Sequence, residues 1–175
     1  MKVNLKKITC DDLLLNKLEF FKMFNIYKTI DCKEHIYVKR YYRNKCLIFK
    51  ERLNLIKVEG TRPIININYV KLIDTIEGTT LEGKHHTGNK LIIIGEIAFT
   101  LICSYSYCNK DKYKLQSITM SFSTSIIIPK DICIREVMNL RYLIEDFTLA
   151  YLEDDKIIVS ITPILQYVDE YCNIS

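Results

Sequence analysis

The side chains of this chain that could do acid–base chemistry are neighbouring carboxylates. Glu145 and Asp146 interrupt an apolar stretch, and two carboxylates held close together can act as a general acid and a general base. They are the local hint of a hydrolase. Nucleophile motifs do not strengthen that hint, because none of the regularly spaced serines stands in a Gly-x-Ser-x-Gly elbow. We therefore predict that the chain is not an enzyme and has no catalytic residues.

Metal and cofactor chemistry is not indicated either. His85 and His86 are adjacent, and neighbours in an extended segment point to opposite sides, so they make a poor ligand pair. The seven cysteines are scattered, and the segment 83–88 lacks the Gly-Lys-Ser/Thr ending of a phosphate loop. We predict no metal and no cofactor, and mostly reduced thiols in a cytosolic protein. Cys103 and Cys108 flank an expected turn on opposite faces, and a disulfide between them stays an open alternative.

Basic and aromatic residues are mixed in the segment 37–45, which offers the chemistry of nucleic-acid binding. Cations neutralise phosphates, and aromatic rings stack on bases. The candidate binding residues are Tyr37, Lys39, Arg40, Tyr41 and Arg43. The same residues also fit a charged strand edge that prevents aggregation. We favour the strand edge and keep nucleic-acid binding as the alternative.

Length and composition set wide limits. With 175 residues the chain forms one domain, or one domain with an added N-terminal piece, and can bury a core. Lys and Arg total 25 and Asp and Glu total 21, and the resulting net charge of +4 singles out no class of partner. No stretch approaches the roughly 20 apolar residues of a membrane span, and the first residues lack the apolar core of a signal peptide. We expect no membrane span and a cytoplasmic location.

The elements that must position these residues are strands, and the clearest lie in residues 88–128. From Ile97 to Tyr107 every odd position is apolar or aromatic, and from Ile118 to Ile128 the main apolar set takes the even positions. This period of two predicts two strands, each with one buried face. The polar segment 108–112 supplies the turn of a β-hairpin. The serine-rich outer side of the hairpin is flat and weakly charged, so another strand or sheet could cover it.

Weaker patterns predict the other elements. Asp11 and Asp12 can cap a short helix, and the apolar residues that follow at helical spacing are Leu14, Leu18 and Phe21, with Leu15 and Phe24 beside them. Residues 64–76 are rich in β-branched side chains and favour a strand, whereas the glycines in residues 77–90 indicate a turn-rich link. One short paired strand within residues 78–83 stays an alternative there. The remaining expected elements are a strand at 46–56 and a second hairpin at 140–161 with its turn at 153–156.

Together these patterns predict a mainly β fold, an antiparallel β-sandwich or partly open barrel with a short N-terminal helix. Alternation looks the same in a sandwich and in a barrel, so both stay open. We expect two parts of the chain. Residues 1–45 would hold the helix and the basic-aromatic extension, and residues 46–175 would form the β domain.

Five sequence blocks follow one another in a family-like order: Glu51 with Leu53 and Ile56, Arg62-Pro63-x-Ile65, the run from Glu77 to Gly83, the run from Thr87 to Gly95, and the run from Phe122 to Pro129. Together they resemble the SPOCS domain family of spore-forming bacteria, over residues 46–168. The resemblance implies a single SPOCS-like β domain, and the sequence departs from the family pattern in showing no LysM module after it. The resemblance also implies a role in spore coat assembly, through binding of a coat morphogenetic protein in the mother cell or at the forespore surface.

We therefore expect a non-enzymatic protein-interaction module linked to sporulation or spore coat assembly. A sheet face or a strand edge would dock a partner protein or another copy of the chain, which would make a homo-oligomer. The alternatives are a nucleic-acid-binding protein that uses the segment from Tyr37 to Lys45, and a hydrolase that uses Glu145 and Asp146.

Overall fold

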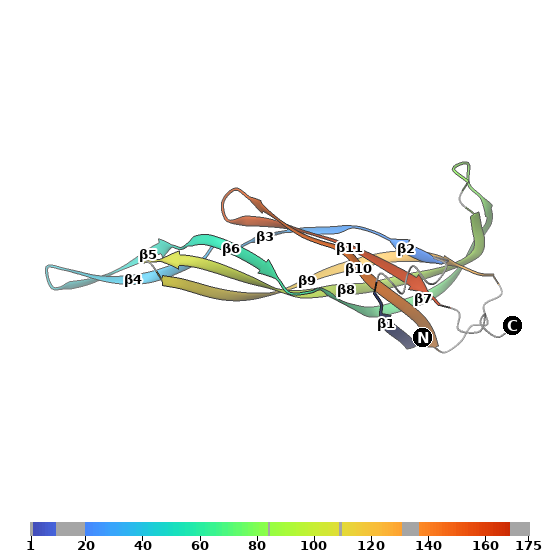
Figure 1. The fold of residues 1–175 in the computed structure, drawn as a ribbon, viewed down its shortest axis with the longest axis horizontal. Coiled ribbons are helices and arrows are strands. Elements are labelled where there is room, and N and C mark those ends of the chain that lie inside the picture. The colour runs from blue at the N-terminus through green and yellow to red at the C-terminus, as the bar shows by residue number, and fades with distance from the viewer. Residues whose placement is uncertain (1, 10–19, 84, 109, 131–136, 169–175) are drawn as a thin grey trace.

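The computed structural model describes residues 2–9, 20–83, 85–108, 110–130 and 137–168. This part of the chain is mainly β, with several sheets and no helix, and the molecule is elongated (Figure 1). The described strands are β1 (Lys2–Lys7), β2 (Phe21–Met23), β3 (Ile26–Asp31), β4 (His35–Tyr42), β5 (Lys45–Arg52), β6 (Asn54–Gly60), β7 (Ile64–Thr79), β8 (His85–Tyr107), β9 (Lys110–Ile128), β10 (Val137–Leu152) and β11 (Lys156–Tyr167).

Two of the sheets share one hydrophobic core. In the first sheet β10 lies between β1 and β11, and β11 pairs with β2 and β3 along its other side. In the second sheet β8 is central, with β6 and β7 along one side and β9 along the other. The buried cluster contains Leu140 and Ile161 of the first sheet and Ile97 and Leu101 of the second. Among the described strands, all pairs are antiparallel except β1 and β10, which run parallel.

The central hairpin confirms the alternation expected for residues 88–128. The odd residues of β8 from Ile97 to Tyr105 are at most 5% exposed. The even apolar residues of β9 from Ile118 to Ile128 are at most 6% exposed, and the serines between them face outward. The turn is shorter than expected, because β9 already begins at Lys110.

Gly95 lies where this hairpin has no room for a side chain. A Cβ atom there would stand 2.4 Å from the backbone oxygen of Asn66 and 2.8 Å from Cζ of Phe122. Phe122 is the direct cross-strand partner of Gly95 in β9. The close packing of β7, β8 and the Phe122 ring therefore depends on the glycine.

The second expected hairpin is also confirmed. β10 and β11 pair from Leu140 and Tyr167 down to Leu152 and Lys156, and their turn is the predicted acidic one. Asp154 and Asp155 have φ values of 62° and 55°, which aspartate tolerates better than most residues. The strand expected at 64–76 is confirmed as part of β7.

The single strand expected at 46–56 is wrong, because the chain breaks at Leu53. β5 ends at Arg52 and β6 begins at Asn54. Leu53 itself is buried, and its N–H donates to the carbonyl oxygen of Glu34 at 2.9 Å. Burial of this one side chain turns the backbone out of the β4–β5 pair and into the second sheet.

The turn-rich link expected at 77–90 is wrong in its extent. β7 continues to Thr79 and β8 starts at His85, so the two strands form a long hairpin with a short turn. The turn is closed by the N–H of Gly83, which donates to the carbonyl of Thr80 at 2.9 Å. Gly88 has a φ of 93°, and the register shifts between Asp74 and Glu77. The irregular backbone bends the strands without ending their pairing.

The helix predicted from Asp11 and Asp12 lies outside the described residues, which leave out 10–19. The chain on both sides of that gap is extended, as β1 and β2. Phe21, which was expected on the apolar side of the helix, lies in β2 opposite Gln166. The Phe24 ring packs on Phe122 of β9, with 5.1 Å between the ring centroids.

Within the described chain, β4 and β5 pair with each other alone and extend beyond the other strands at one end of the molecule (Figure 1). We call residues 35–52 the arm. The division expected between residues 45 and 46 falls beside the turn of the arm. Strands from before and after that position share a sheet, since β1 pairs with β10 and β3 pairs with β11.

Candidate interaction surfaces

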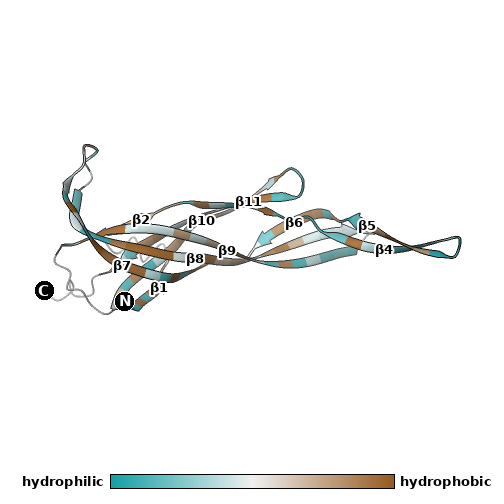
Figure 2. Ribbon diagram, turned by 180° about the vertical axis from the view of Figure 1, so that it is seen from behind, coloured by the Kyte–Doolittle hydropathy of each residue, from teal (hydrophilic) through white to brown (hydrophobic). Residues whose placement is uncertain are grey.

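The arm is a two-stranded hairpin without a covering layer. Arg43 and Asn44 have φ values of 45° and 60°, the left-handed pair that a two-residue type I′ turn requires. Apolar and polar residues alternate along it outside the body of the molecule (Figure 2). Its large apolar side chains are between 42% and 77% exposed: Tyr37, Tyr41, Tyr42, Leu47, Ile48 and Phe49. A lone hairpin of this kind is at best marginally stable in water, so the body must hold its base.

Ion pairs tie the base of the arm to the body. Arg52 donates to Oδ2 of Asp155 in the β10–β11 turn, from Nε at 2.9 Å and from Nη2 at 2.7 Å. Lys114 of β9 donates to the carboxylate of Glu34, directly before the arm. This contact holds the pKa of the Glu34 carboxyl below its usual range. The arm is thus anchored at its base and free along its length.

Three buried side chains, Cys32, Cys103 and Tyr105, lie in the core beneath the point where the arm joins the body. The Tyr105 hydroxyl donates to the backbone oxygen of Cys32 at 2.6 Å, and the thiols of Cys32 and Cys103 belong to the same core cluster. Burial, with Cys103 nearby, raises the pKa of the Cys32 thiol to about 12, and burial also raises the pKa of Tyr105. The Cys32 thiol and the Tyr105 hydroxyl therefore keep their protons at neutral pH, where a thiol is a poor nucleophile, and both side chains are part of the core.

Strand pairing distributes the five predicted nucleic-acid residues over different sides of the arm. Alternate residues of a strand point to opposite faces, and directly paired residues share a face. Tyr37, Lys39 and Tyr41 therefore lie on one face. Arg40 lies on the other face, and Arg43 stands in the turn. The structure brings three of the five together.

We call the side of the arm with Tyr37, Lys39 and Tyr41 the tyrosine face. β5 adds Lys50 opposite Tyr37 and Ile48 opposite Lys39. Sequence reasoning missed Lys50, because only the pairing register shows that it shares this face. Among the described residues, the two lysines have no ion-pair partner and the two tyrosine rings have no aromatic or cation–π contact.

On the opposite face and at the turn, the arginines of the arm interact with other residues of the arm. Nη2 of Arg40 lies 2.5 Å from Oε1 of Glu51, and the Arg40 guanidinium carbon stands 5.4 Å from the centroid of the Phe49 ring. Towards the turn, the Arg43 guanidinium carbon stands 5.5 Å from the centroid of the Tyr42 ring. The arginines of the arm are therefore engaged within the molecule, and its available cations are lysines.

A second exposed surface is the solvent side of the sheet formed by β7, β8 and β9, which we call the outer face. Tyr69 pairs with Ile94, and Ile64 pairs with Ala98. The exposed apolar residues of this face are 40% to 70% exposed: Ile64, Tyr69, Ile94, Tyr113 and Leu115. Between them β9 contributes the outward hydroxyls of Ser117, Thr119, Ser121 and Ser123.

Few charges interrupt the outer face. Along β8 from Ile92 to Ser106, a stretch that the structure describes throughout, Glu96 is the one charged residue that points outward. Lys57 and Glu59 of β6 neutralise each other, with 2.5 Å between Nζ and Oε1. The face is therefore partly apolar, with the outward serines that the sequence predicted, and Lys71 opposite Ile92 and Asp111 opposite Ser106 are further charged residues on it.

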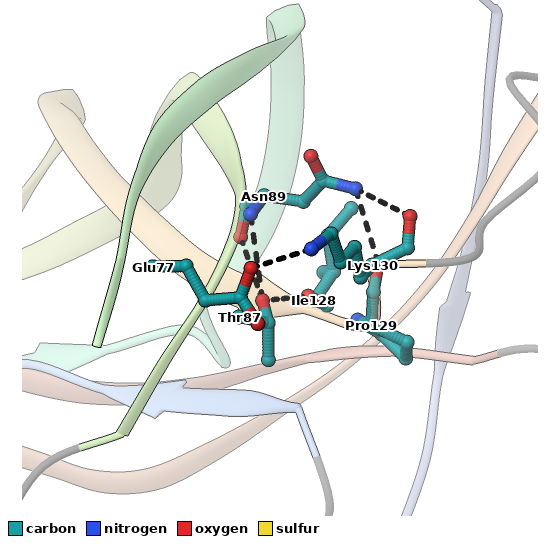
Figure 3. A network of polar contacts seen from close by, with 6 residues as sticks. All are labelled: Glu77, Thr87, Asn89, Ile128, Pro129 and Lys130. Carbon is teal, nitrogen blue, oxygen red and sulfur yellow. Dashed lines mark hydrogen bonds and ion pairs between the residues drawn. The ribbon is translucent and has the colours of Figure 1, made fainter. Parts of the chain in front are cut away.

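A polar network closes the opposite end of the molecule (Figure 3). The Thr87 hydroxyl donates to the backbone oxygen of Ile128 at 2.5 Å. The Asn89 amide donates to the backbone oxygens of Pro129 and Lys130, at 3.3 Å and 2.8 Å. Nζ of Lys130 lies 2.5 Å from the Glu77 carboxylate and holds the pKa of that carboxyl below its usual range.

This network is structural, because its polar groups are used to fix the chain that leaves β9 against β7 and β8. A cleft of about 730 Å³ lies beside it, lined by residues 75–80, His86 and Lys90. A second cleft of about 460 Å³ lies between the edges of β1 and β7. The first cleft is lined by threonine hydroxyls together with Glu77 and His86, and the hydroxyl oxygen of Thr79 lies 3.2 Å from Nδ1 of His85.

The hydrolase and metal candidates are not assembled into sites. Glu145 and Asp146 are exposed at a bulge of β10, and the Thr148 hydroxyl donates to the Asp146 carboxylate at 2.9 Å. Neither lines any of the clefts described here. His85 is exposed at the start of β8 and His86 is half-buried. Within the described residues no group of three His, Cys, Asp or Glu side chains could hold a metal ion.

The thiols expected on opposite faces are confirmed there. Cys103 is buried in the core, whereas Cys108 is exposed at the β8–β9 turn with a φ of 49°. Both are free thiols in this structure.

Across the residues that the structure describes, no helix has the length and apolar character needed to cross a membrane. Comparison with known proteins gives no family for the chain: no protein-family model matches it, and no curated protein or solved structure is significantly similar. The resemblance to the SPOCS domain family therefore stays a prediction.

Proposed function

We propose that this chain is a non-enzymatic protein-interaction module that docks a partner protein through its outer face. The observation that carries the proposal is the exposed apolar set on β7, β8 and β9, which runs from the Tyr69–Ile94 pair at one end to Leu115 and Tyr113 at the other. The half-buried side chains of Ala98 and Ile102 lie between these exposed residues on the same face. Apolar patches on a protein surface are typical of interaction sites. In this proposal the two core-sharing sheets are the layers of an antiparallel β-sandwich, and the outer face is the free side of one layer.

The size of the outer face favours a partner protein over a permanent homodimer. Three strands spaced about 4.8 Å apart and ten residues rising about 3.3 Å each cover roughly 450 Å². An obligate homodimer buries about 1,000 Å² or more on each subunit, whereas weak signalling or assembly contacts bury less than about 600 Å². The outer face fits the second class.

The experiment is to compare capture by variants of the outer face. Immobilised chain is incubated with nuclease-treated lysates of sporulating and vegetative bacterial cells, and bound proteins are quantified by mass spectrometry. The variant Tyr69→Lys/Ile94→Lys places two charges on the solvent side, where the fold tolerates them, and we expect it to lose the protein that the natural chain enriches. Ile76→Lys is the matched control, because Ile76 is 90% exposed and lies in the bent tip of β7.

Equal capture by the natural chain and the double variant would overturn the proposal. Sedimentation of the purified chain tests whether a second copy of the chain, and not a different protein, covers the outer face. A dimer that dissociates in the Tyr69→Lys/Ile94→Lys variant would show that it does. The link to sporulation and coat assembly rests on the resemblance, and enrichment from the sporulating lysate alone would support it.

A further inference from the structure

The net charge of the protein is concentrated in the arm. Residues 35–52 contain six Lys or Arg residues and one Glu, a net charge of +5. The other 157 residues contain 19 Lys or Arg and 20 Asp or Glu, a net charge of −1. A projecting element with this charge attracts a polyanion, while the body of the molecule is neutral towards it.

Within the arm, the cations that remain available lie together with the available aromatic rings. Arg40 is paired with Glu51, and Arg52 is paired with Asp155. Among the residues that the structure describes, Lys39 and Lys50 have no such partner, and both lie on the tyrosine face. Lys45 has no ion-pair partner among them either, but it stands beside the turn on the opposite face.

The spacing on the tyrosine face suits a chain of stacked bases with phosphates between them. Tyr37 and Tyr41 are four residues apart on one strand, which places them roughly 13 Å from each other, with Lys39 between them. The two rings are 71% and 77% exposed, so their faces are open to a ligand. Lysine binds phosphate as a point charge, whereas carboxylates are best recognised by arginine forks. The arginines are already engaged, so this chemistry favours a nucleic acid over an acidic protein.

We infer that the tyrosine face of the arm binds single-stranded nucleic acid. Tyr37 and Tyr41 stack on two bases, and Lys39 and Lys50 neutralise phosphates beside them. This site is separate from the outer face and does not depend on the function proposed for that face.

The test uses fluorescence anisotropy with the full chain and a labelled 12-nucleotide single strand, prepared as DNA and as RNA. Adjacent residues of β4 supply matched pairs that occupy opposite faces: Tyr41 and Tyr42 are the same residue type, and Lys39 and Arg40 carry the same charge. Tyr41→Ala weakens binding about tenfold, while Tyr42→Ala changes it by less than about twofold. Lys39→Ala weakens binding more than Arg40→Ala, although both remove one positive charge.

Salt dependence gives a second readout. The slope of log affinity against log salt becomes shallower by about 0.7 in Lys39→Ala and again in Lys50→Ala, one phosphate contact each. Circular dichroism melting curves check that the variants fold, which the exposure of all these side chains favours.

Three results would overturn the inference. Equal losses within the Tyr41/Tyr42 and Lys39/Arg40 pairs would show that net charge alone attracts the strand. Binding of the same sequence as a duplex with equal affinity would remove the role of stacking on unpaired bases. Displacement of the oligonucleotide by polyglutamate at equal charge concentration would identify an acidic protein as the better ligand.

Discussion

The β8–β9 hairpin and the arm are both antiparallel hairpins, but one face of β8–β9 is buried in the core, whereas the arm is exposed on both faces. In β8–β9 most of the large apolar residues share one face, which is buried against the first sheet, and Ile94, Tyr113 and Leu115 are the large apolar residues exposed on the other. In the arm the large apolar residues divide between the two faces: Ile48 lies with Lys39 on one, and Phe49 lies with Val38 on the other. Neither face can be covered without leaving apolar side chains on the other. Division of the apolar residues, and not a lower apolar content, is what leaves the arm outside the core.

The two hairpins therefore have different roles, one in stability and the other in ligand access. Burial gives β8–β9 its stability and leaves one outward face of hydroxyls and exposed apolar side chains. The arm contributes little buried area and is held by the contacts at its base, so its side chains are available to ligands. Three predictions test the contrast, in addition to the binding experiments above.

The largest expected effect separates core from arm. Leu101→Ala in β8 removes a side chain with 0% exposure, and we expect the free energy of unfolding to fall by about 2–5 kcal/mol. Ile48→Ala in the arm, where the side chain is 63% exposed, changes it by less than about 0.5 kcal/mol. Urea denaturation of both variants measures the difference. A comparable loss in Ile48→Ala would mean that the arm is covered in solution.

A smaller effect distinguishes two hydrogen bonds at the base of the arm: the buried one from Tyr105 to Cys32 and the more exposed one from Tyr107 to Glu51. Tyr105→Phe leaves the buried Cys32 carbonyl without its 2.6 Å hydrogen bond, at a cost of about 1–3 kcal/mol. Tyr107→Phe, on the same strand, removes a 3.4 Å contact with Glu51 of the arm and costs less than about 0.5 kcal/mol. Thermal melting of the two variants compares the two stability losses. A larger loss in Tyr107→Phe than in Tyr105→Phe would show that contact with the arm stabilises the fold.

The smallest effect is a change in pH dependence. The Cys32 thiol has a pKa raised from 9.0 to about 12 in the folded protein, so it keeps its proton where the unfolded thiol loses it. This contribution to stability is present below pH 9 and disappears as the pH rises from 9 to about 12, so stability falls with pH, by at most about 1.4 kcal/mol per pH unit for one group.

Urea midpoints between pH 8 and pH 11 provide the measurement for Cys32. Cys32→Ala flattens the decline, because the titrating group is gone. Cys46→Ala removes an exposed thiol of the arm and leaves the decline unchanged. If both variants decline like the natural chain, the loss of stability at high pH comes from other groups.

The sequence by itself determined the elements in which apolar residues keep a strict period. Alternation in residues 97–107 and 118–128 predicted the central hairpin, its buried face and its serine face, because a period of two leaves a strand no other way to bury them. The acidic turn before Lys156 likewise predicted the β10–β11 hairpin. The basic-aromatic segment was recognised as a candidate site, and its residues were named.

Only the tertiary structure decided how distant segments meet. The break at Leu53 depends on a hydrogen bond to Glu34 and on burial against the body, and the long β7–β8 hairpin depends on partners far from its glycines. The division of Tyr37, Lys39 and Tyr41 from Arg40, and the arrival of Lys50 beside Tyr37, follow from a register that local patterns do not specify. Pairing and burial are long-range interactions, and a linear sequence shows which residues need them but not which partners supply them.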